Sequence, residues 1–278
     1  MGSVVNHIKF EVIEESNCRL TNLQINYAGE LTHSSLAVEL AYALARIRFG
    51  VQSDHFKYWD ETVRGLRVNS DLEKKILTAY VRPSLGTENE PLPSDQIEGV
   101  VAETLWYEVA SNSESQEGLP IRMEEPHFTV TEPGGDGLVV YKESEGKYLF
   151  RLWEVKKHNT SGAATSKITE ASRQLSTKGA EYLAKWSKVS QEVDNEHPNL
   201  SKFYARLVEL WLMADPQARA GISISKKSGS YVTNTPVAKA KAELTDMIHD
   251  GQVEVMLIDI PNFTALAEDM RKVIWSGI

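Results

Sequence analysis

Three side chains suited to metal-assisted chemistry stand close together in the sequence. Asp136 lies in a Gly-Gly-Asp-Gly segment, and Glu154 and Lys156 end an apolar run that begins at Leu149. Because alternate side chains of a strand share one face, a strand here would point Glu154 and Lys156 the same way and Val155 the other way. A hairpin that joins the two segments would bring Asp136 alongside Glu154.

These groups suit the hydrolysis of a phosphodiester bond. Mg²⁺ prefers oxygen ligands and keeps several waters, so Asp136, Glu154 and the backbone carbonyl of Val155 could hold Mg²⁺, or Mn²⁺ in its place. The metal would lower the pKa of a bound water and offset charge in the transition state. Lys156, a compact point charge, would orient that water or stabilise the developing negative charge. A Glu-x-Lys triplet alone is common, and an exposed strand with a paired acid and base is the alternative interpretation.

Hydrophobic periodicity and turn residues predict the elements that would position these side chains. A helix is expected just before the motif, followed by three short strands that include it and then by alternating helices and strands. The expected helices are 95–110, 165–189, 200–213, 237–248 and 264–275, and the expected strands are 128–131, 138–141, 148–157, 220–225 and 253–258. This order predicts an α/β fold with a mixed central β-sheet flanked by helices.

The first third of the chain is expected to form an N-terminal α+β accessory region. Residues 8–13 alternate as a strand does, and residues 34–49 carry leucines at helical spacing. Prolines and glycines between residues 82 and 96 predict a linker. We therefore place a boundary there, with the accessory region at 1–93 and the second domain at 94–278.

The composition limits the possible functions. The net charge of −9 is unlike that of a free-standing nucleic-acid binder, which usually has a basic face, but residues 147–188 hold nine basic and three acidic residues, a local charge of +6. One cysteine excludes an internal disulfide, and no apolar run is long enough for a bilayer, so we expect a cytoplasmic protein without a membrane partner. No Walker A sequence is present. The basic segment Lys226-Lys227-Ser228-Gly229 is expected to form a turn, with a phosphate contact as the alternative.

The spacing of Asp136, Glu154, Val155 and Lys156 resembles the motif of the PD-(D/E)xK nuclease superfamily. That motif is an Asp, a variable gap, an Asp or Glu, any residue and a Lys. The resemblance covers about residues 96–190 and implies a restriction-endonuclease-like core. Within the superfamily, the size and layout look like those of HamA-type nuclease subunits of the bacterial Hachiman phage-defence system, which work with a helicase.

The resemblance implies further site residues. Family members often place a glutamate on the helix before the first strand, and Glu103 is our candidate, with Glu98 and Glu108 as rivals. They also place polar residues on the helix after the motif. Gln174 and Lys167, with Arg173 nearby, could contact the nucleic acid there, as could Lys157 beside the motif, although plain solvation of that helix face is an equal alternative.

The leading hypothesis is a Mg²⁺-dependent deoxyribonuclease, the effector of an anti-phage defence complex. Asp136 and Glu154 would hold the metal, Lys156 would serve the transition state and Glu103 would assist. The acidic net charge favours a partner that delivers or controls the DNA, and a helicase or translocase is expected. The alternative hypothesis is a catalytically silent nuclease-fold module that binds nucleic acid or a partner protein.

Overall fold

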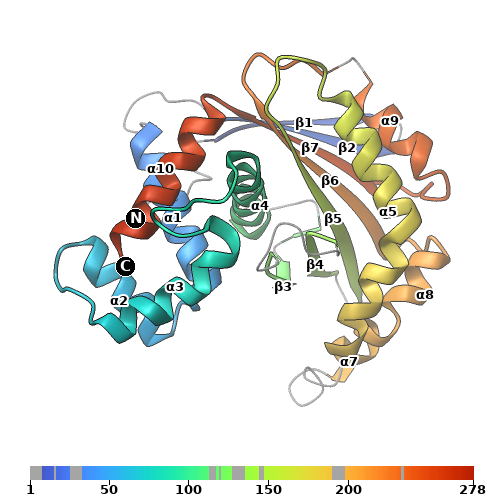
Figure 1. The fold of residues 1–278 in the computed structure, drawn as a ribbon. Helices are drawn as coiled ribbons and strands as arrows, with labels where there is room; N and C mark the ends of the chain where they lie inside the picture. The colour runs from blue at the N-terminus through green and yellow to red at the C-terminus, as the bar shows by residue number, and fades with distance from the viewer. Residues whose placement is uncertain are drawn as a thin grey trace.

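The computed structural model describes residues 8–15, 17–25, 33–112, 117–118, 120–126, 135–143, 147–189, 198–232 and 235–278. These residues form a seven-stranded mixed sheet with helices on both faces (Figure 1). The strands are β1 (Ile8–Glu15), β2 (Cys18–Ile25), β3 (Pro120–Met123), β4 (Gly137–Lys142), β5 (Tyr148–His158), β6 (Ala218–Lys227) and β7 (Val253–Ile260). No helix in the described part of the chain has the length and apolarity needed to cross a bilayer.

The strand order is β1-β2-β7-β6-β5-β4-β3. The four central strands, β2, β7, β6 and β5, are parallel to one another, and antiparallel strands complete the sheet on both sides. The carboxyl ends of the parallel strands therefore lie along one edge of the sheet. The fold class is the predicted one, α/β with a mixed central sheet flanked by helices.

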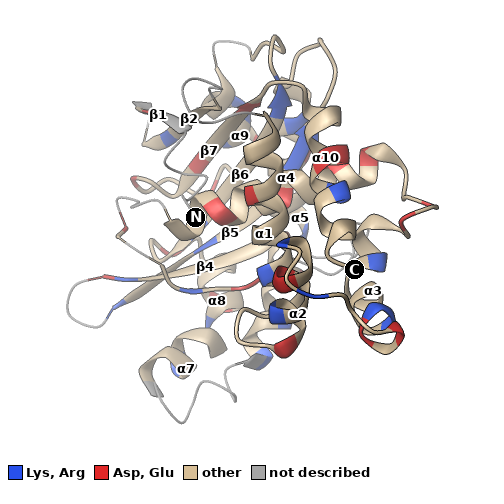
Figure 2. Ribbon diagram, turned by 90° about the vertical axis from the view of Figure 1, so that its left-hand side faces the viewer, with Lys and Arg blue, Asp and Glu red and all other residues tan. Residues whose placement is uncertain are grey.

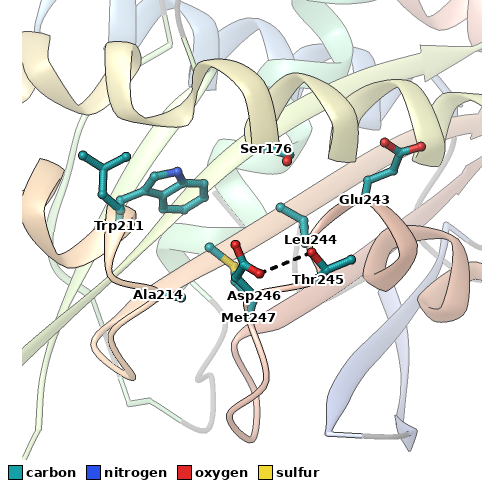
Figure 3. A pocket seen from close by; sticks show the side chains of 9 residues that line it. Ser176, Trp211, Ala214, Glu243, Leu244, Thr245, Asp246 and Met247 are labelled. Atoms are coloured by element: carbon teal, nitrogen blue, oxygen red, sulfur yellow. Dashed lines mark hydrogen bonds between the residues drawn. The ribbon is translucent and has the colours of Figure 1, made fainter.

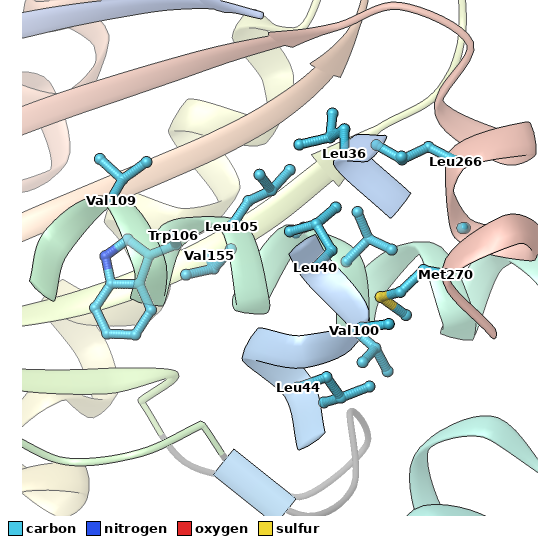
Figure 4. Close-up of a cluster of buried hydrophobic side chains, with 14 of the residues drawn as sticks. Leu36, Leu40, Leu44, Val100, Leu105, Trp106, Val109, Val155, Leu266 and Met270 are labelled. Carbon is cyan, nitrogen blue, oxygen red and sulfur yellow. The ribbon is translucent and has the colours of Figure 1, made fainter. Parts of the chain in front are cut away.

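One face of the sheet is covered by helices from the first 112 residues and by the last helix. These are α1 (His33–Phe49), α4 (Ser94–Asn112) and α10 (Phe263–Ser276), and the smaller α2 (Asp54–Val63) and α3 (Asp71–Leu85) pack outside them. Figure 4 shows the interior of this layer, where leucines of α1 meet Val100 and Leu105 of α4 and Met270 of α10. We call this face the α4 face.

The opposite face is covered by α5 (Thr165–Trp186), α7 (Pro198–Ala205), α8 (Leu207–Leu212) and α9 (Pro236–Glu243), with a short 3₁₀ turn at Ser187–Val189. We call it the α5 face. Strand alternation divides the buried side chains between the faces. In β5, Phe150 and Leu152 belong to the α5-face cluster, while Trp153 and Val155 belong to the α4-face cluster.

Most of the elements expected after residue 94 are present, with shifts of a few residues at their ends. The expected helix 200–213 is two helices, α7 and α8, because the chain breaks at Arg206. The expected helix 237–248 ends early, at Glu243. The expected strand 128–131 lies outside the described residues, and β2, β3, α2 and α3 were not predicted.

Segments on both sides of the expected boundary share one sheet and one core. Strand β2 pairs in parallel with β7 from Cys18 opposite Val253 to Gln24 opposite Asp259. Helix α1 packs against α10 and α4. The expected linker 82–96 is mostly ordered, since α3 continues to Leu85, α4 begins at Ser94, and a bridge between Gly86 and Pro91 closes the turn between them.

Candidate active site

The start of β4 and the middle of β5 bring Asp136, Glu154 and Lys156 together. The two strands pair in antiparallel fashion with Gly137 opposite Trp153. The Asp136 amide donates to the Trp153 carbonyl at 3.1 Å, and Asp136 Oδ2 accepts the Val155 amide at 2.5 Å. The hairpin thus fixes the Asp136 carboxylate beside the peptide groups of the Glu-Val-Lys triplet.

Glu154 and Lys156 both point to the α5 face, as strand alternation predicted. Lys156 Nζ donates to Glu154 Oε1 at 2.7 Å and to Gln174 Oε1, on α5, at 3.2 Å. Gln174 Nε2 donates in turn to the Tyr182 hydroxyl at 2.9 Å. The ammonium group of Lys156 is therefore held between a strand carboxylate and a helix amide.

Close packing at two glycines shapes the approach to Asp136. A Cβ on Gly137 would lie 1.9 Å from Trp106 of α4, and a Cβ on Gly135 would lie 2.9 Å from Leu152 Cδ1. Neither glycine has a positive φ. At Gly137 a side chain is excluded because the Trp106 ring presses against the backbone, whereas at Gly135 the nearest atom is the end of a flexible leucine side chain.

The contact between Trp106 and Gly137 also places Glu103. Residues three apart on a helix lie on one face, so Glu103 sits one turn before Trp106 and faces the start of β4. Burial raises the pKa of Glu103 well above its usual value, and the charges of Asp136 and Glu154 raise it further, against an opposing effect of Arg48. Glu103 therefore lies within electrostatic reach of both carboxylates.

The two rival glutamates on α4 have other partners. Glu98 accepts hydrogen bonds from Lys157 at 3.1 Å, Asn159 at 2.6 Å and Thr264 at 2.8 Å. Glu108 accepts from Arg46 at 3.2 Å. The geometry thus favours Glu103 over both rivals.

The electrostatics of the site are those of crowded carboxylates. Burial raises the pKa of Asp136 to about 6, although the Val155 amide and Lys156 act in the opposite direction. Burial and the charge of Asp136 raise the pKa of Glu154 to about 8. Burial would lower the pKa of Lys156, but the Glu154 carboxylate raises it above its usual value. Lys156 stays charged while its carboxylate neighbours resist ionisation.

Oxygen atoms suited to a hard cation remain available here. Glu154 Oε2 is buried and has no hydrogen-bond partner among the described residues. The Val155 amide faces Asp136, and a strand residue's N–H and C=O point to the same edge, so the Val155 carbonyl faces that side too. The pairing of β4 with β5 ends at Gly137 opposite Trp153, so within the described residues β4 pairs no residue with Val155. Asp136, Glu154 and Val155 therefore fit the ligand set predicted for Mg²⁺ or Mn²⁺.

Side chains alone would not complete the coordination of a metal ion at this site. Within the described ranges, no group of three or more His, Cys, Asp and Glu side chains is arranged to hold a metal ion. A cation at Asp136 and Glu154 would need the Val155 carbonyl and water as further ligands. Mg²⁺ commonly binds in this way, through one or two carboxylates and several waters.

The residues predicted to contact nucleic acid have protein partners. Gln174 holds Lys156, Lys157 pairs with Glu98, Lys167 pairs with Glu170 at 2.6 Å, and Arg173 pairs with Glu243 at 2.8 Å. Even so, basic residues gather at the carboxyl ends of two neighbouring strands, at 156–157 in β5 and 226–227 in β6 (Figure 2).

Two residues of this region were not predicted from the sequence. Tyr182 orients the Gln174 amide, and the eight-residue spacing that puts both on one side of α5 could have indicated it. Arg48, at the end of α1, donates to the Pro126 carbonyl at 3.2 Å, and its positive charge acts to lower the pKa of Glu103. No local pattern links Arg48 to the motif, because the two meet only through the packing of α1 on α4.

A cavity of about 140 Å³ lies between α5, α8 and the segment that follows α9 (Figure 3). Its lining includes Ser176, Trp211, Glu243 and Asp246, and Thr245 donates to Asp246 at 3.4 Å. It shares no residue with the site around Asp136.

No protein-family model matches this chain, and no curated protein matches its sequence.

Proposed function

We propose that the protein is a metal-dependent nuclease that hydrolyses phosphodiester bonds of DNA. One observation carries the proposal: a hairpin holds Asp136 and Glu154 together beside Lys156, with Glu154 Oε2 buried and lacking a hydrogen-bond partner among the described residues. Other buried polar atoms, such as Ser223 Oγ and Ser225 Oγ, also lack a partner among the described residues, but Glu154 Oε2 is a carboxylate oxygen near Asp136, and a cation would complete it. The resemblance to the PD-(D/E)xK motif agrees with the same chemistry.

Each residue has a distinct part in the proposed mechanism. Asp136, Glu154 and the Val155 carbonyl would hold Mg²⁺ or Mn²⁺, which supplies an acidified water and charge neutralisation when bound. Lys156, kept cationic by Glu154 and oriented by Gln174, stabilises negative charge that develops on the phosphate. Glu103, whose raised pKa favours the protonated form, is suited to hold or release a proton beside Asp136.

A partner protein is part of the proposal. The chain has a net charge of −9, and the basic residues at the ends of β5 and β6 are mostly paired with carboxylates. Long-range attraction to DNA is therefore weak, and a helicase or translocase would deliver the substrate. An anti-phage defence complex with such a subunit is the setting that the HamA-type layout favours.

The decisive experiment is cleavage of supercoiled plasmid by the wild-type chain with Mg²⁺, with Mn²⁺ and with EDTA, beside Lys156→Ala and Glu98→Gln. We expect metal-dependent nicking by the wild type and by Glu98→Gln, and a loss of about 10²-fold or more in Lys156→Ala, as is typical when one stabilising charge is removed. The assay is run with the chain alone and with the proteins that co-purify with it from its native source. Equal cleavage by Lys156→Ala would refute the assignment.

The alternative is a module that binds nucleic acid or a partner without cutting. It is favoured by the absence, among the described residues, of a third metal-ligating side chain beside Asp136 and Glu154. Under this alternative no preparation nicks the plasmid with either metal, and Lys156→Ala binds DNA as the wild type does.

A further inference from the structure

A second polar site lies at the carboxyl ends of two adjacent strands whose following helices pack on opposite faces of the sheet. After β6 the chain enters α9 on the α5 face, whereas after the neighbouring strand β7 it enters α10 on the α4 face. In open α/β sheets, such a change between adjacent parallel strands leaves a crevice outside their carboxyl ends, and ligands bind there. The position is therefore set by topology, independently of Asp136 and Glu154.

A cavity of about 520 Å³ opens at this place. We call it the switch-point cavity; its lining includes Glu11, Asn22, Gln24, Lys226, Leu257 and Asp259. Strand register explains why these side chains meet. Gln24, Asp259 and Lys226 lie side by side across β2, β7 and β6, and Glu11, Asn22 and Leu257 form the neighbouring row across β1, β2 and β7.

One side of the cavity is pre-arranged by hydrogen bonds. Lys226 Nζ donates to Asp259 Oδ2 at 3.1 Å and to the Ser230 carbonyl at 3.1 Å, and Ser228 Oγ donates to Asp259 Oδ1 at 2.7 Å. Each carboxylate oxygen can accept a further hydrogen bond. The Asp259 carboxylate is thus fixed in orientation and can still accept from a ligand hydroxyl.

The other side offers amides. Asn22 and Gln24 are two residues apart in β2, so their side chains lie about 7 Å apart on one face. Asn22 Nδ2 makes only a 3.5 Å contact with Glu11 Oε2, and no hydrogen bond within the described residues engages the Gln24 amide. Amide side chains both donate and accept, as the edges of nucleobases do.

The charges of the lining select against anions. Glu11 and Asp259 carry negative charge and Lys226 is already paired, so the lining has a net charge of −1. A carboxylate that accepts from sugar hydroxyls, amides that match a base edge and an apolar surface at Leu257 together suit a neutral ligand rich in hydroxyl and amide groups. A free phosphate would meet repulsion.

We propose that the switch-point cavity binds a nucleoside, with Asp259 holding the sugar hydroxyls and Asn22 and Gln24 contacting the base. None of its lining residues belongs to the proposed cleavage site, so this proposal and the proposed nuclease activity stand or fall separately.

The test is calorimetric titration of the full chain with adenosine, guanosine, cytidine and uridine, with D-ribose and AMP as comparison ligands. Titrations run up to about 10 mM, tenfold above a weak Kd of about 1 mM. One variant combines Asn22→Ala with Gln24→Ala. A second, Glu11→Gln, is titrated as well so that the lining can still be tested if the double variant does not fold. Gln52→Ala, an exposed amide between α1 and α2, is the matched control.

We expect saturable binding of at least one nucleoside to the wild type. The Asn22–Gln24 double variant should bind that nucleoside at least about tenfold more weakly, and Gln52→Ala should bind it as the wild type does. AMP should bind more weakly than adenosine because its phosphate faces Glu11 and Asp259. The proposal is overturned if no nucleoside saturates the wild type, if D-ribose binds as well as the nucleosides, if AMP binds more tightly, or if the double variant binds as the wild type does.

Discussion

Strand β5 carries two buried charged side chains three positions apart, Arg151 and Glu154, and their surroundings differ. The Arg151 guanidinium donates to Glu117 at 2.7 Å, to the Ala220 carbonyl at 2.9 Å and to the Gly251 carbonyl at 3.1 Å. Glu154 has Lys156 on one oxygen and no partner within the described residues on the other. Two carboxylates of the protein compensate the charge of Arg151, whereas one oxygen of Glu154 lacks a hydrogen-bond partner among the described residues.

The pKa values follow the same division. Burial opposes ionisation of Glu117, but the charges of Arg151, Arg19 and Arg219 outweigh burial and hold its pKa far below the usual range. At Glu154, burial and Asp136 act together, and Lys156 alone does not offset them. Removing one member of a buried ion network is strongly destabilising because it leaves a charge unpaired, whereas carboxylates that resist ionisation mark a candidate site for a cation.

The largest expected effect is on the compensated side. Arg151→Met should lower the free energy of unfolding by about 3–5 kcal/mol, because Glu117 and Glu254 would stay buried with Arg19 as the one cation among the described residues that still pairs with both. Urea denaturation followed by circular dichroism measures it. Arg206→Ala, which breaks an exposed pair with Glu209, is the control and should change stability by less than about 1 kcal/mol. A loss that small in Arg151→Met would erase the contrast between the two regions.

The next effect concerns pH on the uncompensated side. Unfolded Glu154 releases its proton near pH 4.5 and folded Glu154 only near pH 8, so the folded chain binds the extra proton between these values. The free energy of unfolding of the metal-free protein should therefore fall as pH rises from about 4.5 to 8. Glu154→Gln should make this fall shallower. Denaturation in EDTA at a series of pH values tests this, and parallel curves for the two proteins would count against it.

A smaller effect separates the glutamates of α4. Glu98→Gln should cost about 1.5–3 kcal/mol of stability, since Glu98 joins α4 to β5 and α10 through charged and neutral hydrogen bonds. It should leave plasmid cleavage close to wild type, whereas Glu103→Gln should reduce cleavage. Thermal melting and the plasmid assay are read on the same preparations. A Glu98→Gln protein that is stable but inactive would reverse the assignment of the two residues.

The smallest effect is expected at the surface. Lys167 pairs with Glu170 on exposed α5, so Lys167→Ala should change stability by less than about 0.5 kcal/mol. If Lys167 contacts a phosphate, the salt dependence of DNA binding should become shallower by about 0.9 in the log–log slope. Fluorescence anisotropy at several salt concentrations measures the slope, and an unchanged slope would leave Lys167 as a solvated residue.

Local sequence patterns predicted the arrangement of the motif residues better than the strand pairing and helix packing around them. Alternation in β5 correctly put Glu154 and Lys156 on one face, and the hairpin correctly put Asp136 beside them. The pattern failed where long-range pairing decides: β2 alternates too weakly to be recognised and is a strand because β7 lies beside it. The resemblance already favoured Glu103 with Glu98 and Glu108 as rivals, and the packing of Trp106 on Gly137, which no spacing in the sequence reveals, supports that choice.

The most direct test of the contrast on β5 is a titration of the metal-free protein with Mn²⁺, followed by calorimetry. We predict one bound ion per chain, lost in Glu154→Gln and retained in Glu98→Gln, whose glutamate is equally buried but fully partnered. No Mn²⁺ binding by the wild type, or equal binding by Glu154→Gln, would contradict the proposal that Asp136 and Glu154 form a metal site.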